Sequence, residues 1–336
     1  MLESNNKLTP DTQSDHSVSY IEYPMVNQKR VISVLFILFA ASGWASSGLF
    51  INGIADNSDL TPLNLAFLRE SLSFVFYLIV VIAWKPSYLR VARKDLIWLA
   101  LMGGIGIGIF HALWNTSVLA NGMSVGTMLQ YNEAIIISLA AVYFFQEKLH
   151  WRKLVAIAGS LGGTALISGI VSLDTGKLTT FGLLVGLASA VTHAGFNLFG
   201  KKLSGSYHPI TIIFYAFGFG SLALLPLQFI NPLPTTVSPA AIGYLALLVI
   251  YPTILAFVLF TAALKWMPVS TANIIAISEV PMAAILGYIF LDEILDPWQT
   301  LGAALVVLSV ILVSVGRRKS PVQDSEQGSV QDSEEP

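Results

Sequence analysis

The chain has 336 residues, of which 54% are hydrophobic and 11% are charged, and its mean hydropathy is +0.70. An ordinary soluble domain carries about 25% charged residues, so this composition excludes a soluble globular protein and a disordered chain. The net charge of -2 gives no general attraction for nucleic acid, and the lack of cysteine excludes disulfides and cysteine-ligated metal sites. The composition therefore predicts a protein whose main partner is the lipid bilayer.

Ten apolar segments follow one another along the chain. At about 1.5 Å per residue, each is long enough to cross a hydrocarbon core of roughly 30 Å. They occupy residues 31–54, 65–84, 96–119, 124–145, 154–171, 180–199, 210–229, 240–264, 269–291 and 298–316. Continuous apolar runs in lipid form helices, because the backbone must satisfy its own hydrogen bonds. The fold class expected is an all-α polytopic membrane protein with ten transmembrane helices and no cleaved signal peptide.

The positive charges gather on one side of this arrangement. With the N-terminus in the cytoplasm, the loops on the cytoplasmic side contain almost all Lys and Arg residues, and Lys177 lies opposite. These are Lys29, Arg30, Lys85, Arg90, Arg93, Lys94, Lys148, Arg152, Lys153, Lys201, Lys202, Lys265, Arg317, Arg318 and Lys319. The positive-inside rule then places both termini in the cytoplasm and the protein in the cytoplasmic (inner) membrane.

The chain contains a weak internal repeat of five helices. A shift of 146 residues brings Glu133 onto Glu279 and Glu147 onto Glu293, and a shift of 149 brings Trp44 onto His193. Because five is an odd number, the second copy enters the membrane from the opposite side. Inverted repeats are typical of secondary transporters, with the substrate near the midplane between the halves.

Several motifs resemble the EamA family of the drug/metabolite transporter superfamily. They are Asn64-Leu65-Ala66-Phe67-Leu68-Arg69, Ser278-Glu279-Val280-Pro281, and a helix that ends in Glu-x-Leu before Gly302-Ala303-Ala304. Tyr131-Asn132-Glu133-Ala134 departs from the family pattern, which has a proline there. The sequence looks closest to the YddG-type amino acid exporters, and this resemblance implies export of amino acids, either neutral or aromatic.

The resemblance also gives an expected domain organisation. Residues 1–30 form a cytoplasmic tail, residues 31–171 the first EamA-like repeat and residues 172–316 the second. Residues 317–336 form an acidic tail that we expect to be disordered, because it is short and has no aromatic residue. The fifth and tenth helices contain few polar groups and are expected to brace the outside or to form a homodimer.

Two carboxylates, Glu133 and Glu279, lie near the middle of their helices. Ionisable groups at this depth are costly, so each is a candidate functional residue. They could bind a substrate ammonium group or carry a coupling proton, and the alternative is that they only join helices. Trp44 and His193 are expected to line the same cavity, although His193 can equally serve as an interhelical hydrogen-bonding group.

The third and fourth helices add a dense polar stretch. His111, Trp114 and Asn115 follow helical spacing, and Tyr131 precedes Glu133. We expect aromatic faces and amides here to surround a small substrate. Arg69 either pairs with Glu70 or another acid, or binds a substrate carboxylate, and pairing is the usual arrangement for a buried charge.

The function expected is alternating-access export of small metabolites, most simply amino acids. Cationic drugs or other metabolites of the superfamily are the alternative substrates. An intramembrane enzyme that uses His111 or His193 with Glu133, and a passive channel, are the other hypotheses. No HExxH, GxGD or Walker motif is present, so we expect no enzyme, no metal and no other cofactor.

Overall fold

The computed structural model describes residues 28–121, 123–167, 179–290 and 297–314. Within these ranges the chain consists of helices and their connections, with no β-strand. The expectations for the two tails, for Lys177 and for Glu293 lie outside the described residues.

The helices of the two halves follow the same order. The first half contains α1 (Gln28–Ala55), α2 (Pro62–Trp84), η1 (Pro86–Leu89), α3 (Arg93–Gly103), η2 (Gly104–Ile109), α4 (Phe110–Asn121), α5 (Met123–Gln130), α6 (Glu133–Phe145) and α7 (Trp151–Ile167). The second half contains α8 (Thr180–Ser204), α9 (Pro209–Leu224), α10 (Leu227–Ile230), α11 (Pro239–Leu248), η4 (Val249–Leu255), α12 (Ala256–Ala263), α13 (Val269–Ala276), α14 (Glu279–Phe290) and α15 (Pro297–Ser314).

These elements form a bundle of membrane-spanning length. Nine helical stretches of the described chain are long and apolar enough to cross a membrane. The tenth expected span corresponds to α7, which has 17 described residues. Large apolar side chains such as Leu139 and Leu184 are more than 60% exposed, whereas Glu70 and Glu133 are buried. This inside-out distribution suits a lipid solvent, and the predicted all-helical polytopic fold is confirmed.

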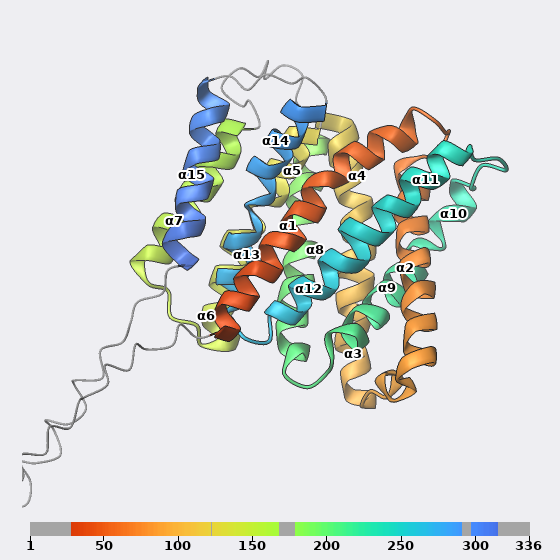
Figure 1. Ribbon diagram of the computed structural model, residues 1–336, viewed down its shortest axis with the longest axis horizontal. Coiled ribbons are helices and arrows are strands. Elements are labelled where there is room, and N and C mark those ends of the chain that lie inside the picture. The colour runs from red at the N-terminus through yellow and green to blue at the C-terminus, as the bar shows by residue number, and fades with distance from the viewer. Residues whose placement is uncertain (1–27, 122, 168–178, 291–296, 315–336) are drawn as a thin grey trace, which may run out of the picture.

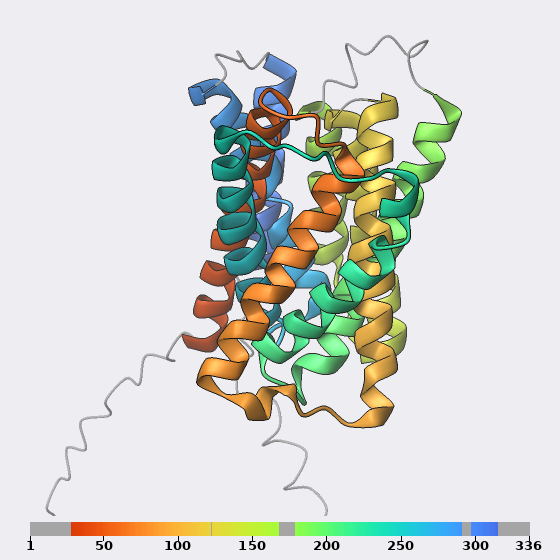
Figure 2. The same cartoon turned by 90° about the vertical axis from the view of Figure 1, so that its right-hand side faces the viewer.

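The two halves run in opposite directions. We call the end of the bundle where α1 begins the lower face and the end where α1 finishes the upper face. Figures 1 and 2 show α1 running from the lower to the upper face, and α8, at the start of the second half, running back. This is the inversion that a five-helix repeat requires.

Both halves have a broken helix at the same place in the repeat. Helix α5 stops before Tyr131-Asn132, and α13 stops before Ile277-Ser278, which lie 146 residues later. Glu133 and Glu279 are therefore the first residues of α6 and α14. The positive end of each half-helix dipole favours a negative charge at these positions.

The two breaks have different chemical causes. In the second half, Pro281 lacks an N–H and its ring crowds the carbonyl of Ile277, four residues earlier. In the first half, the side-chain amide of Asn132 donates to the carbonyls of Met128 and Leu129 at 3.3 and 3.0 Å. The side chain thus replaces a backbone donor. The span expected over 124–145 therefore consists of two helical pieces, α5 and α6, and the span expected over 269–291 consists of α13 and α14.

Each half also contains a widened turn in its third span. The turns η2 and η4 are π-helical, and η4 contains Pro252. Wide turns of this kind occur where the regular backbone ladder is interrupted, and Pro252, which has no N–H, interrupts it in η4. Thr61 caps α2 and Pro62 begins it, three residues before the start of the apolar segment 65–84.

Helices α7 and α15 pack against each other at the side of the bundle (Figure 1). A Cβ atom added at Gly163 would lie 2.6 Å from the carbonyl oxygen of Gly302. Only glycine allows the two backbones to approach this closely, as the GxxxG spacing of Gly159 and Gly163 predicts. This pair stands beside the helices that carry the polar residues.

Candidate functional site

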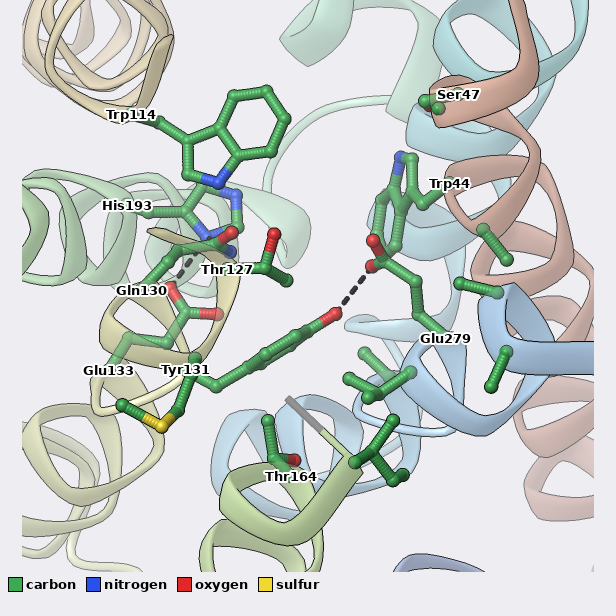
Figure 3. Close-up of a pocket in the computed structure, with 18 of the residues that line it drawn as sticks. Trp44, Ser47, Trp114, Thr127, Gln130, Tyr131, Glu133, Thr164, His193 and Glu279 are labelled. Atoms are coloured by element: carbon green, nitrogen blue, oxygen red, sulfur yellow. Dashed lines mark hydrogen bonds and ion pairs between the residues drawn. The ribbon is translucent and has the colours of Figure 1, made fainter. Parts of the chain in front are cut away.

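A cavity of about 480 Å³ lies between the two halves. It brings together most of the polar residues that the sequence singles out. Its lining includes Trp44, Arg69, His111, Trp114, Tyr131, Glu133, His193 and Glu279. Figure 3 shows the labelled members of this set pointing toward one another from both repeats. The size and the mixed aromatic and polar lining suit a small organic molecule.

Glu133 forms the polar centre of one wall. Its Oε2 lies 2.5 Å from Nδ1 of His193, and its Oε1 accepts a 2.8 Å hydrogen bond from the side-chain amide of Asn273. Nε2 of Gln130 lies 3.4 Å from the same histidine nitrogen. The carboxylate is thus held by one residue from α8 and one from α13, both of the second repeat. The position of its negative charge is fixed by the packing of the two halves.

Glu279 occupies the opposite wall. The hydroxyl of Tyr131 donates a 2.6 Å hydrogen bond to Oε2 of Glu279 (Figure 3). Trp44, the repeat counterpart of the histidine that contacts Glu133, lines the same cavity as Glu279. The sequence repeat is therefore also present in the geometry of the site.

Aromatic rings form much of the remaining surface. The ring centroid of Trp44 lies 5.3 Å from those of both Phe257 and Phe260. Phe110 stacks on His193 with a centroid distance of 4.3 Å. The indole nitrogens of Trp44 and Trp114 are buried without a hydrogen-bond partner in the described part of the chain. Both residues line the cavity, so these N–H groups are donors that a bound molecule can use.

Arg69 contributes the positive charge of the site. Its Nε donates a 2.6 Å hydrogen bond to the hydroxyl of Thr253, and its Nη2 lies 3.5 Å from the carbonyl oxygen of Pro252. Glu70 instead has its contact with Nδ1 of His111, at 2.5 Å. The direct pairing of Arg69 with Glu70 that the sequence suggested is therefore wrong. A hydroxyl and a carbonyl hold the guanidinium, which leaves it able to bind an anion.

Asn115 is the candidate that the structure places elsewhere. Its side-chain amide donates a 2.8 Å hydrogen bond to the carbonyl oxygen of Pro62, and it lies outside the cavity lining. This bond joins α4 to the start of α2. Asn115 directly follows Trp114 and points to a different side of the helix, where it makes a structural contact outside the cavity.

Some residues of the site were missed by reasoning from the sequence. Thr253, which accepts a hydrogen bond from Arg69, is neutral and of a residue type that commonly joins helices, so the sequence gives it no signal. Asn273 is the repeat counterpart of Thr127, and both line the cavity. The shift of 146 residues could have identified this pair. Among the described residues, no group of three or more His, Asp or Glu is arranged to hold a metal ion.

The cavity extends toward the upper face. On α1 its lining runs from Trp44 to Asn52, and on α15 it includes Gln299 near the helix start. Residues related by the repeat differ in exposure. Ala283 lines the cavity while its counterpart Ile137 is fully buried, and the same holds for Met128 and Ile274. The half of the pathway toward the upper face is thus open, and the equivalent half toward the lower face is filled by packed side chains.

The lower face is closed by a set of contacts that we call the lower latch. Glu147, which follows α6, accepts a 2.8 Å hydrogen bond from the backbone N–H of Val269, the first residue of α13. Its Oε2 also accepts from the hydroxyl of Ser270 and lies 3.0 Å from Nζ of Lys153. Lys153 donates to the Ser270 hydroxyl at 2.7 Å. The latch therefore joins the two repeats below the cavity.

The family assignment follows from comparison with known proteins. The model of the EamA-like transporter family matches residues 31–169 and 180–315, one match in each half of the chain. The chain belongs to the EamA-like transporter family. It is therefore a multi-pass membrane protein of a transporter family, as its motifs suggested.

The sequences of three relatives align with this chain over most of its length and over nearly all of their own. "Uncharacterized transporter YwfM" of Bacillus subtilis is 27% identical over 88% of this chain and 98% of its own. "Probable terminal-alkyne amino-acid exporter" of Streptantibioticus cattleyicolor is 26% identical over 82% of this chain and 92% of its own. "Uncharacterized inner membrane transporter YicL" of Salmonella typhimurium is 25% identical over 85% of this chain and 96% of its own. A solved crystal structure shares the fold with a TM-score of 0.70 at 16% identity, covering 83% of this chain and 95% of its own.

Proposed function

We propose that this EamA protein exports amino acids across the cytoplasmic membrane by alternating access. The observation that carries the proposal is a midplane cavity in which two carboxylates and one guanidinium face the same space. Glu133 and Glu279 offer negative charge for an ammonium group, and Arg69 offers positive charge for a carboxylate. A zwitterion satisfies both, and the rings of Trp44 and Phe257 suit an apolar or aromatic side chain.

The half-open pathway supports alternating access. Because the repeats are equivalent in sequence pattern, exchanging their conformations would bury Ala283 and expose Ile137. The broken helices at Glu133 and Glu279 supply polar groups at the midplane, where transporters with inverted repeats bind substrate. A cavity that opens to one side at a time moves one substrate molecule per cycle, so transport is saturable. A passive channel does not need a cavity of this kind.

The loop charges support the orientation. Lys85, Arg90, Lys153 and Lys201 belong to connections or helix ends at the lower face, so the positive-inside rule makes this face cytoplasmic. The cavity then opens away from the cytoplasm, and the conformation is outward-facing. The relative named as a probable amino-acid exporter and the relative named as an inner membrane transporter support the substrate class and the location.

Organic cations are the second candidate substrates. Two acidic side chains near the rings of Trp44 and Trp114 can hold a cation without help from Arg69. The two candidates differ in whether a carboxylate on the substrate improves transport. Comparing an amino acid with the amine that has lost its carboxyl group therefore separates them.

The test is transport by the purified protein in liposomes. Uptake of labelled tryptophan and leucine is measured with and without excess unlabelled amino acid, and the recovered label is identified chemically. We expect saturable uptake, competition by amino acids and recovery of unchanged substrate. The last result separates transport from turnover by the Glu133–His193 pair. Uptake no greater than in protein-free liposomes, with folding and insertion verified, would contradict the proposal.

A further inference from the structure

Glu70 and His111 form a buried pair whose acidic member lies outside the lining of the proposed substrate site. Glu70 on α2 has an exposed fraction of 0%, and His111 on α4 has one of 5%. Nδ1 of His111 lies 2.5 Å from Oε1 of Glu70, whereas Oε2 of Glu70 has no hydrogen-bond partner in the described part of the chain. One proton can reside either on Nδ1 of His111 or on Oε1 of Glu70, so the pair has a defined place for a proton.

The fold leaves room for this carboxyl group. Helix α9 passes beside it at Gly220, where an added Cβ atom would lie 2.7 Å from Oε2 of Glu70. Any larger residue at this position would displace the carboxyl group. The acid is therefore enclosed by α2, α4 and α9 without being part of the cavity lining. A fully enclosed acid needs another group to exchange protons with water.

His111 is placed to make that connection. It lines the cavity, and its Nδ1 is directed to Glu70. An imidazole can accept a proton on one ring nitrogen and release one from the other, which is the usual basis of a proton shuttle. A proton from cavity water can thus reach Glu70 through His111. The carboxyl group itself need not become exposed.

The charges near the pair connect it to the substrate site. The titratable groups that face it are Arg69 from α2 and His193 from α8, with Glu133, Glu279 and Tyr131 around the cavity beyond them. His111 and His193 flank the ring of Phe110, at centroid distances of 4.8 and 4.3 Å. A positive charge added to the cavity repels a proton on His111, because charges interact strongly across a space of low dielectric constant.

We propose that Glu70 and His111 form a proton-binding site, separate from the substrate carboxylates, that makes transport a proton–substrate antiport. The inference rests on the proposed function. A substrate ammonium group beside Glu133 and Glu279 repels a proton on the pair, so the two bind in alternation. The proton is taken from water on one side of the membrane and released on the other, while the substrate moves in the opposite direction. No other bond is formed or broken.

The experiment compares two kinds of transport in proteoliposomes. Counterflow, with amino acid on both sides and no pH gradient, reports substrate exchange alone. Uptake driven by an acidic interior reports proton coupling, because internal protons leave as substrate enters. For one-for-one exchange, a gradient of one pH unit supports about tenfold accumulation. Glu70→Gln should keep counterflow and lose this accumulation.

Ser73→Ala is the matched control. Ser73 is buried on α2 and its hydroxyl donates to the carbonyl of Arg69, so the substitution removes a buried hydrogen bond without removing a titratable group. We expect this variant to retain both counterflow and pH-driven accumulation. Equal stimulation of the wild type and Glu70→Gln, or no stimulation of the wild type, would overturn the proton site while leaving amino acid transport intact.

A substrate-independent measurement keeps the two proposals distinguishable. If the wild type shows no counterflow of amino acids, the proposed function fails, and the proton site is decided by infrared difference spectra of the purified protein at two pH values. A titrating carboxylic-acid band present in the wild type and in Ser73→Ala, and absent from Glu70→Gln, supports the site. Spectra of the wild type and Glu70→Gln that coincide would overturn it.

Discussion

The hydroxyl of Tyr131 donates a 2.6 Å hydrogen bond to Glu279 across the cavity, from the break in one repeat to the first residue after the break in the other. This bond fixes the position of one of the two carboxylates that face the substrate space. It also joins the two repeats at the level where they must move relative to each other. The tyrosine is therefore a positioning residue for Glu279.

The first prediction concerns this hydroxyl. Tyr131→Phe keeps the ring and removes the donor, so Glu279 loses its orientation in the cavity. A hydrogen bond to a charged group contributes about 1.5–3 kcal/mol, and we expect the KM for amino acid uptake to rise about tenfold.

Tyr77→Phe provides the matched control for Tyr131→Phe. The Tyr77 hydroxyl donates a 2.6 Å bond to the carbonyl of Ile254 and is equally buried, but it lies outside the cavity lining. We expect a lower thermal stability with an unchanged KM. If both tyrosine variants change the KM by the same factor, the positioning role of Tyr131 is wrong.

The second prediction concerns the paired carboxylates. Glu133→Gln and Glu279→Gln retain the shape of each side chain but cannot balance an ammonium charge. Each should lower kcat/KM for uptake by more than about tenfold, since truncating one member of a buried charge pair costs several kcal/mol. Asn115→Ala, which removes the bond to Pro62 outside the cavity, should leave the KM unchanged. Retention of wild-type kinetics by both glutamine variants would remove the carboxylates from the binding site.

The third prediction concerns Arg69. The wild type should transport tryptophan at least about tenfold more efficiently than tryptamine, which lacks the carboxylate, because a charge-assisted contact with the guanidinium is lost. In Arg69→Gln the kcat/KM values for tryptophan and tryptamine should be about equal. The measurement is kcat/KM for both compounds in both proteins. A wild type that prefers tryptamine would support organic cations as the substrates instead.

The fourth prediction concerns the lower latch. The chain has no cysteine, so single cysteines can be introduced without other changes. Ile274, buried below the cavity, is the repeat counterpart of Met128, which lines it. We expect Ile274→Cys to be unreactive toward a membrane-impermeant maleimide, and to become reactive from the lower face when combined with Glu147→Gln.

Met128→Cys is the control for the labelling experiment. It should react from the upper face in the wild-type background, and more slowly when Glu147→Gln shifts the protein toward the opposite conformation. Labelling of Ile274→Cys that is the same with and without Glu147→Gln would contradict a gating role for the latch.

Much of the fold could be predicted because the membrane imposes strong rules. Apolar segments of spanning length must be helices, and the matching Glu133 and Glu279 reveal the repeat. The break at Pro281 is also readable, because proline cannot continue the backbone ladder. The equivalent break at Asn132 could not be predicted, since an asparagine side chain interrupts a helix only when it competes successfully for nearby carbonyls.

The partners of the buried charges were harder to predict than their existence. Arg69 and Glu70 are neighbours in sequence, yet adjacent helical residues point in different directions. Glu70 therefore meets His111 of another helix, and Arg69 meets Thr253 of the second repeat. Such contacts depend on how helices distant in sequence pack. The same limit explains why Trp114 faces the cavity while Asn115 contacts Pro62.

The most direct test of the account is calorimetric titration of tryptophan into the purified protein and into Glu279→Gln. The account predicts saturable binding to the wild type at one site per chain, and binding at least about tenfold weaker in the variant. Tryptamine and indole-3-propionate, each lacking one of the two charges, should bind the wild type more weakly than tryptophan. Equal affinities of the wild type and Glu279→Gln for tryptophan would contradict an amino acid site in this cavity.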